Sequence, residues 1–362
     1  MGEMETYRDR LLIEIIAEKL YFGRLSDALP GRDIYPPYLF VIVGLFIEYG
    51  LFDVYNHLIS GKSSFLAQPN TLAIPAMTVL GVVGLRYIHD SYVTAMVNLG
   101  VDDDHVDLDE ALRREFEGLV SLRVRVAGYV ATLVVYYAFV AVVLGIPQLI
   151  EISGIGLVLY AQTVTFPLII IPILFELGIS YIGIHLIIPR RLAAADFGLF
   201  FYDPRNLGGF EPIGELLKRS YYIYTAILLL WFLQTHTPVI LSQFVSSPYP
   251  APGPIFQTAL SAVWIAGVVT IVYSMSKTHS IMKRKKEEKI RSLEEELKRV
   301  VNDPYDATLF NIEDRERYEE VQETISHVKD TRTYPTTFAM WSQIFISVLL
   351  PQALNMVVQL PG

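Results

Sequence analysis

Residues 256–300 read FQTALSAVWIAGVVTIVYSMSKTHSIMKRKKEEKIRSLEEELKRV, and this stretch decides how the chain is arranged. Its first part is mainly apolar, and its second part is rich in Lys and Arg. An apolar run of about 20 residues crosses a hydrocarbon core of about 30 Å as a helix, and basic flanks mark the cytoplasmic side. The stretch therefore predicts a span that leaves the membrane into the cytoplasm and continues there as a helix.

Six other apolar segments extend this pattern to an all-α, seven-helix transmembrane bundle. The predicted spans are residues 37–55, 71–85, 126–146, 155–188, 221–241, 256–275 and 335–360. Of the 29 Lys and Arg residues, 28 then fall on one side, and only Lys62 falls on the other. The positive-inside rule predicts a cytoplasmic N-terminus and an extracellular C-terminus. Rhodopsins and G-protein-coupled receptors run the opposite way, and the last span has no lysine for a retinal Schiff base.

Four regions follow from this topology. Residues 1–36 form a cytoplasmic amphipathic helix, 37–276 the first six spans with their cytoplasmic loops, 277–334 a cytoplasmic helical anchor, and 335–362 the seventh span. The predicted apolar stripe of the N-terminal helix is Leu12, Ile15, Ile16 and Leu20. This helix either lies on the inner leaflet or packs on the cytoplasmic ends of the spans.

Composition narrows the class of protein. The chain has 52% hydrophobic residues, a mean hydropathy of +0.39, a net charge of −9 and no cysteine. We expect a multi-pass protein of the plasma membrane that binds neither nucleic acid nor a cofactor, and the absence of catalytic motifs argues against an enzyme. The acidic run 102–110 lacks the glycine of an EF-hand loop, because Asp107 stands there, so a helix start is favoured over a metal site.

Ionisable side chains inside spans are candidate functional residues. Glu48 lies in the first span, and Glu176 and His185 lie in the fourth. Either buried pairing or a ligand cavity would explain them, and the sequence does not choose between these. Asp53 and His57, four residues apart, are expected near the outer interface in contact with solvent.

The long loop before the last span carries an apolar stripe of Ile290, Leu293, Leu297 and Val300. The stripe covers about two heptads, which suits a bundle contact better than a free coiled coil. A second helical segment, 312–329, completes a hairpin. The hairpin is predicted to mediate assembly with a second copy or a partner; the alternative is a solvated charged helix.

The last span has no charge but several polar residues, and one helical face of it is polar on the inside and apolar on the outside. That face consists of Gln343, Ser347, Leu350, Leu354 and Val358. Around a symmetry axis, it would give a wet inner vestibule and an outer hydrophobic gate. Alternatively, its polar side chains bond to neighbouring helices within one monomer.

These features resemble the seven-transmembrane ion channels typified by insect odorant and gustatory receptors. The likeness covers the topology of nearly the whole chain and implies a remote prokaryotic or archaeal member. Gustatory receptors carry Thr-Tyr, about five hydrophobic residues and Gln-Phe in the last span; here Thr337-Phe338 precede Gln343, and the next aromatic is Phe345. Tyr is thus replaced by Phe, the spacing is shorter, and one residue separates Gln from Phe.

The resemblance implies a homotetrameric channel that conducts cations and discriminates little between them. Four copies of the last span would line the pore, with Gln343 and Ser347 inside and Leu350, Leu354 or Val358 as gate. The hairpin would form the central anchor, and the outer halves of the other spans would hold a small-molecule pocket. The rival is a monomeric or dimeric carrier or sensor that binds its ligand near Glu48, Glu176 and His185.

Overall fold

A computed structural model describes residues 10–29, 34–61, 65–66, 68–99, 115–116, 118–195, 197–242, 254–301, 312 and 314–335. Within this part of the chain, the ordered elements are helices, and the only strand-like contact is an isolated antiparallel bridge between Val301 and Ile312. The all-helical prediction is therefore confirmed for the described residues.

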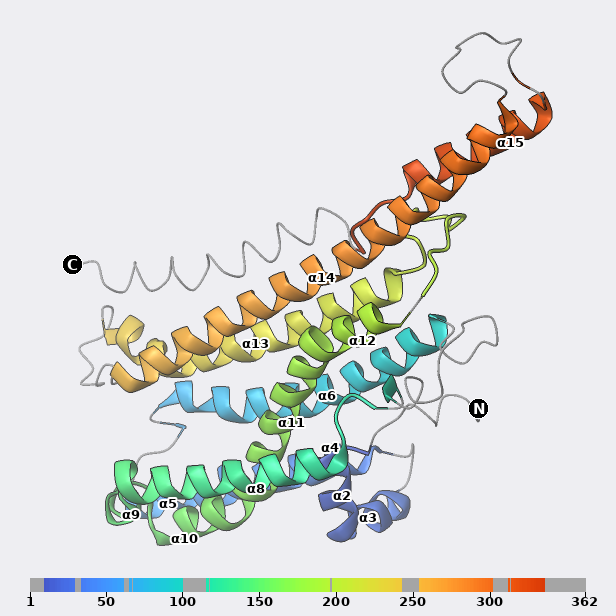
Figure 1. Cartoon of the computed structure of the whole chain (residues 1–362). Helices are drawn as coiled ribbons and strands as arrows, with labels where there is room; N and C mark the ends of the chain where they lie inside the picture. The colour runs from blue at the N-terminus through green and yellow to red at the C-terminus, as the bar shows by residue number, and fades with distance from the viewer. Residues whose placement is uncertain are drawn as a thin grey trace.

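Figure 1 shows several long helices side by side, a helical segment that crosses between them, and a hairpin that projects from one end. The first elements are α2 (Leu12–Lys19), α3 (Phe22–Ala28), α4 (Pro36–Leu45), η1 (Phe46–Asp53), α5 (Val54–Ser60), η2 (Pro69–Leu72), α6 (Ala73–Asn98), α8 (Leu122–Phe139) and η3 (Val140–Leu144). Then follow α9 (Ile146–Ser153), α10 (Ile155–Tyr160), η4 (Ala161–Ile170), α11 (Ile171–Ile182), η5 (Gly183–Ile187), α12 (Ile188–Ala194), α13 (Glu211–Ser242), α14 (Pro254–Val300) and α15 (Arg315–Asp330).

Six helical segments in the described residues are long and apolar enough to cross a membrane. They are Pro36–Ser60, Pro69–Asn98, Leu122–Leu144, Ile155–Ala194, Glu211–Thr237 and Thr258–Val300. They coincide with the first six predicted spans. The predicted seventh span, apart from its first residue Pro335, lies outside the described residues.

Basic side chains collect at one end of this bundle, which we call the basic end. Arg86 and Arg219 lie near it on α6 and α13, Arg123 lies at the start of α8, and Arg191 lies on α12. Arg191 Nη1 donates to Gly118 O at 2.7 Å, which ties the connection before α8 to the end of the fourth segment.

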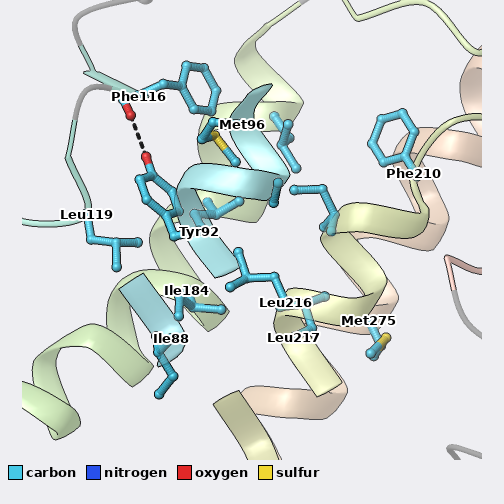
Figure 2. Close-up of a cluster of buried hydrophobic side chains, with 14 of the residues drawn as sticks. Ile88, Tyr92, Met96, Phe116, Leu119, Ile184, Phe210, Leu216, Leu217 and Met275 are labelled. Atoms are coloured by element: carbon cyan, nitrogen blue, oxygen red, sulfur yellow. Dashed lines mark hydrogen bonds between the residues drawn. The ribbon is translucent and has the colours of Figure 1, made fainter. Parts of the chain in front are cut away.

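The largest hydrophobic core lies towards the basic end, where α6, α12, α13 and α14 meet (Figure 2). Tyr92 of α6 donates its hydroxyl to Phe116 O at 2.5 Å and so satisfies a polar atom within the core. The labelled side chains around it are Ile88, Met96, Phe116, Leu119, Ile184, Phe210, Leu216, Leu217 and Met275. Residues far apart in sequence thus form one packed unit.

The second span is longer than the sequence predicts. α6 continues past Leu85 to Asn98, because Arg86 and Asp90 form an exposed i,i+4 ion pair at 3.8 Å while the other side of the helix stays apolar. Ile88 and Met96 on that side are almost fully buried. The apolar segment that hydropathy identifies ends where the first charged residues appear. The helix itself continues, because the face that packs on the bundle stays apolar up to Met96.

The fourth segment accommodates its prolines by widening rather than by breaking. Pro167 lies inside η4, a π-helical stretch, and Pro172 and Pro189 occupy first-turn positions of α11 and α12. Proline has no N–H to donate and clashes with the preceding turn of an α-helix. In a π-helix, the missing proline N–H leaves the carbonyl five residues earlier without its backbone partner. The carbonyls five residues before Pro167 and Pro172, Gln162 O and Pro167 O, accept hydrogen bonds from the hydroxyls of Tyr137 and Tyr129, each at 2.6 Å.

The N-terminal helix packs on the bundle through a wider face than the predicted stripe, mainly at its first turn. α2 contacts α4 and α11, so it shows the second of the two predicted arrangements. Its buried residues are Leu12, Ile13 and Ala17, with Leu11 just before them, whereas Leu20 is 44% exposed. Of the predicted stripe, Leu12 is buried and Ile16 packs against the core, whereas Leu20 is exposed. Leu11, Ile13 and Ala17 are buried as well because the first turn of α2 is inserted into the bundle.

The connection between α12 and α13, residues 195–210, contains a turn built around Asp203. Partial burial raises the pKa of Asp203, but hydrogen bonds from the backbone N–H groups of Arg205, Leu207 and Gly209 outweigh it and hold the pKa below its usual value. Gly208 and Gly209 have φ of +62° and +79°, which side-chain-bearing residues rarely adopt. Beyond the turn, α13 runs back from the basic end of the bundle (Figure 1).

Close packing of α6 on α13 depends on the absence of a side chain at Gly84. A Cβ there would lie 2.6 Å from Ile223 Cγ2, whereas a Cβ at Gly178 would meet nothing within 4 Å. We expect Gly84→Ala to destabilise the protein by about 1–3 kcal/mol through overpacking. Gly178→Ala, the matched control, should be neutral or stabilising by up to about 1 kcal/mol. Thermal unfolding in detergent checks both, and equal effects of the two variants would contradict this packing.

Candidate functional site

Glu48, Glu176 and His185 occupy three separate surroundings. All three side chains are buried, as their positions in predicted spans led us to expect. Glu48 lines a cavity, Glu176 forms an ion pair, and His185 lies between two serines. Each therefore has its own chemistry, and the structure does not bring them into one site.

Glu176 pairs with a basic residue that sequence reasoning did not identify as its partner. Arg125 Nη1 lies 2.5 Å from Glu176 Oε1, with side-chain exposures of 3% and 0%. Sequence reasoning treated Arg125 as a loop residue before the third span, but α8 begins earlier, at Leu122. The sequence did contain one indication of this pair: Glu176 lies inside a predicted span, and a carboxylate there needs a basic partner.

This ion pair also fixes the N-terminal helix. Glu176 Oε2 accepts a hydrogen bond from Leu12 N at 2.7 Å, and Arg125 Nη1 donates to Arg10 O at 2.9 Å. Leu12 is the first residue of α2, where backbone N–H groups have no partner within the helix. The Glu176 carboxylate thus caps α2 from another helix, and its negative charge suits the positive end of the helix dipole.

His185 joins the fourth segment to α13 and α14. Its Nε2 lies 3.0 Å from Ser220 Oγ, and its Nδ1 lies 3.0 Å from Ser274 Oγ. Each serine hydroxyl also lies within hydrogen-bond distance of a backbone carbonyl three residues earlier, Leu217 O or Ile271 O. A neutral imidazole has one N–H, so one serine donates to the ring while the other accepts from it.

A cavity of about 270 Å³ lies at the end of the bundle opposite the basic end. We call it the carboxylate cavity. Its lining residues are Glu48, Tyr49, Asp53, Phe65, Gln68, Thr71, Ile74, Leu149, Ile152, Ser153, Leu157, Val158, Ala161, Gln162 and Phe166. They come from the first span, the connection after it, the start of the second span, α9 and the start of the fourth span, so five stretches of chain line one space.

π-Helical geometry places both carboxylates on this cavity. Glu48 and Asp53 lie five residues apart in η1, a π-helix, whose i→i+5 hydrogen bonds stack such residues one turn apart. In an α-helix, they would point about 140° apart. With the α-helical spacing expected from the sequence, Asp53 would instead share a face with His57, four residues later.

The two carboxylates differ in their partners. Asp53 Oδ2 accepts a hydrogen bond from Phe65 N at 2.9 Å. Glu48 Oε2 and Thr165 Oγ1 are both buried, and neither makes a hydrogen bond of standard geometry among the described residues. The Thr165 hydroxyl nevertheless lies close enough to the Glu48 carboxyl to interact with it. The expectation that Asp53 is solvated was wrong: the side chain is buried because Phe65 and the cavity wall cover it. Thr165 was not identified from the sequence, since a threonine in a span carries no distinctive signal.

The predicted anchor stripe packs within the chain. Leu293 is buried against Val321, Ile325 and Val328 of α15, and Ile290, Leu297 and Phe201 pack around this cluster. Val300 is partly buried at the end of α14. The hairpin itself is therefore as predicted, but most of its stripe is covered by α15 and does not present a free face for a second copy.

Several predicted positions lie outside the described residues. These are the pore-lining set Gln343, Ser347, Leu350, Leu354 and Val358, and the acidic run 102–110. Among the residues that the structure describes, no group of three or more His, Asp or Glu side chains is arranged to hold a metal ion.

Neither models of known protein families nor comparisons with curated proteins and with solved structures give a match to this chain. Its class therefore rests on its own helices: in the described part of the chain, six are long and apolar enough for a multi-pass membrane protein.

The buried ion pair predicts non-additive stability effects. Arg125→Gln or Glu176→Gln alone leaves an unpaired buried charge, which should cost about 3–5 kcal/mol. The double variant removes both charges, so its loss should be smaller than the sum of the two single losses. Thermal unfolding of all four proteins measures the coupling. Arg123→Gln, an exposed arginine on the same helix, is the control and should change stability little; additive losses would show that the pair is not coupled.

Proposed function

We propose that this chain is a homotetrameric, cation-conducting ion channel of the insect chemoreceptor-like type, in which residues 335–360 line the pore. The observation that supports it best is the course of the chain after α14. The α14–α15 hairpin leaves the basic end of the bundle and returns to it (Figure 1). The last apolar segment thus begins beside the sixth one.

Specific contacts hold the returning chain against α14. Lys286 Nζ donates to Lys329 O at 2.6 Å and to Thr331 O at 2.7 Å. His279 Nδ1 lies 2.9 Å from Thr333 O, and its ring stacks on that of Tyr334 with centroids 4.0 Å apart. The predicted last span starts at the next residue.

Length and charge support a seventh crossing from this point. As a helix, residues 335–360 would extend about 39 Å, which exceeds a hydrocarbon core of about 30 Å. With the basic end in the cytoplasm, this segment runs outward and ends outside. The carboxylate cavity then lies in the outer half of the protein, where a ligand from outside would reach it.

The intrachain packing of the hairpin changes one part of this proposal. Since α15 covers Leu293 and its neighbours, a tetramer would not assemble through that stripe. The contacts between copies would instead involve other faces of the hairpin together with the last span.

A gating test uses Leu354 in the proposed outer constriction. Leu354→Ser should make the constriction wettable and raise the resting conductance of reconstituted protein at least severalfold. Leu159→Ser is a matched control, because Leu159 lies in the fourth segment and is 63% exposed on the bundle surface. Planar-bilayer recording measures both variants, and electron-microscopy class averages should show fourfold particles. Equal leak from the two variants would contradict a pore along the last span.

The carboxylate cavity also favours a second candidate, a monomeric or dimeric carrier or sensor. It would use Glu48 alone, because Glu176 and His185 have their partners elsewhere. Monomeric or dimeric particles, together with a Leu354→Ser variant that does not leak, would favour this candidate over the channel.

A further inference from the structure

The carboxylate cavity holds an acidic group at its buried end. Exposure falls from 48% at Ile152 to 8% at Glu48. Neither Glu48 Oε2 nor Thr165 Oγ1 makes a hydrogen bond of standard geometry in the described part of the chain. The Thr165 hydroxyl lies close to the Glu48 carboxyl, so a guest at this end of the cavity would meet both groups. Burying a carboxyl oxygen without a partner costs free energy that a bound hydrogen-bond donor would recover.

The charged residues around the cavity indicate which charge the bound donor carries. Two carboxylates line the cavity, and none of the described lining residues is Lys, Arg or His. Asp53 Oδ2 already accepts a backbone N–H, whereas Glu48 Oε2 makes no such bond in the described residues, so Glu48 gains more from a bound donor. Lys62, the one base in the predicted outer loops, lies outside the described residues. A cationic donor therefore fits the lining better than an anion does.

The remaining lining selects the rest of the guest. Leu157, Val158 and Phe166 present hydrocarbon, and the rings of Tyr49 and Phe65 also line the space. Calcium takes six to eight oxygen ligands, and such a set is not present among the described lining residues. Aromatic faces attract organic cations, so a cation with an apolar body matches both parts of the wall.

We propose that the carboxylate cavity binds a small primary amine in its protonated form, with the ammonium group against Glu48 and its apolar body against Leu157, Val158 and Phe166. The volume of about 270 Å³ lies just below the range of about 300–1,000 Å³ for small-molecule sites, so the ligand is small. This inference names the ligand class for the outer site of the proposed channel; ligand-evoked current depends on that function, whereas binding does not.

The test compares two probes of nearly equal shape on the full chain in phosphatidylcholine nanodiscs. 2-Phenylethylammonium carries the charge, and 2-phenylethanol does not. Calorimetric titration of the unmodified protein should show saturable binding of the amine, at least tenfold tighter than binding of the alcohol. Methylammonium, which lacks the apolar body, should bind at least tenfold more weakly than 2-phenylethylammonium. Equal affinities within either comparison, or no binding of the amine, would overturn the proposal.

Variants then locate the site. Glu48→Gln keeps the shape of the side chain and should weaken amine binding at least tenfold while leaving that of the alcohol unchanged. Glu151→Gln is the matched control, because Glu151 is an exposed carboxylate on α9 that does not line the cavity. Equal effects of the two variants would refute the assignment of Glu48. The probe comparison on unmodified protein stands independently if Glu48→Gln fails to fold.

Lys62→Gln separates a bound amine from an internal counter-charge. If the amine binds only after this lysine is removed, the chain itself supplies the cation, and the proposal is wrong.

Current recordings keep this inference distinct from the proposed function. Amine binding that evokes no current would count against the channel alone, and an amine-evoked current unaffected by Glu48→Gln would count against the cavity alone.

Discussion

Taking a carboxylate into a helical bundle costs several kcal/mol unless a counter-charge or hydrogen-bond donors meet it. In this chain, that requirement joins parts that are far apart in sequence. Glu176 meets Arg125 from the third span and the first N–H of α2, so one carboxylate fixes three elements. The N-terminal helix is thereby part of the bundle. The same requirement makes Glu48 conspicuous, since its buried Oε2 makes no hydrogen bond of standard geometry in the described residues.

Local widening of helices decides which side chains meet. η1 and η4 both line the carboxylate cavity, and both are π-helical. π-Helical turns often occur at functional sites because they redirect side chains within an otherwise continuous helix. Here, η1 brings Glu48 and Asp53 to the same wall, and η4 allows Pro167 to sit inside the fourth segment. A binding cavity thus forms without breaking either segment.

Much of the helical plan could be predicted from the sequence, because apolar length and basic flanks are local properties. The first six spans, the continuation of α14 beyond the sixth span and the turn at Asp203 all follow from such patterns. The partners of buried polar groups could not be predicted in this way. Arg125 meets Glu176 only because α8 begins earlier than hydropathy indicates, and Asp53 turns towards the cavity only because η1 is not α-helical.

The packing of the α14–α15 hairpin also shows that local patterns do not identify the partner of a surface. An apolar stripe at Ile290, Leu293 and Leu297 predicts a partner surface, but periodicity cannot tell a second copy from a later segment of the same chain. The cluster with Val321 and Val328 shows that α15 covers the stripe. Intrachain pairing only closes the loop of residues 301–314 between the two helices, whereas assembly carries the entropic cost of association.

The fourth segment offers a physical connection between the cavity and the end of the bundle near the hairpin. It runs from the cavity wall at Ala161 and Gln162, past Glu176, to His185, which reaches Ser274 on α14. Coupling between distant sites needs an element that has two discrete arrangements, and each site must shift the equilibrium between them. The π-helical stretches at Ala161–Ile170 and Gly183–Ile187 are suited to that role, since a change between π- and α-helical hydrogen bonding rotates every side chain beyond it. A ligand held by Glu48 would contact the first of these stretches directly, so any effect of the cavity on α14 has a continuous path of helix through which to act.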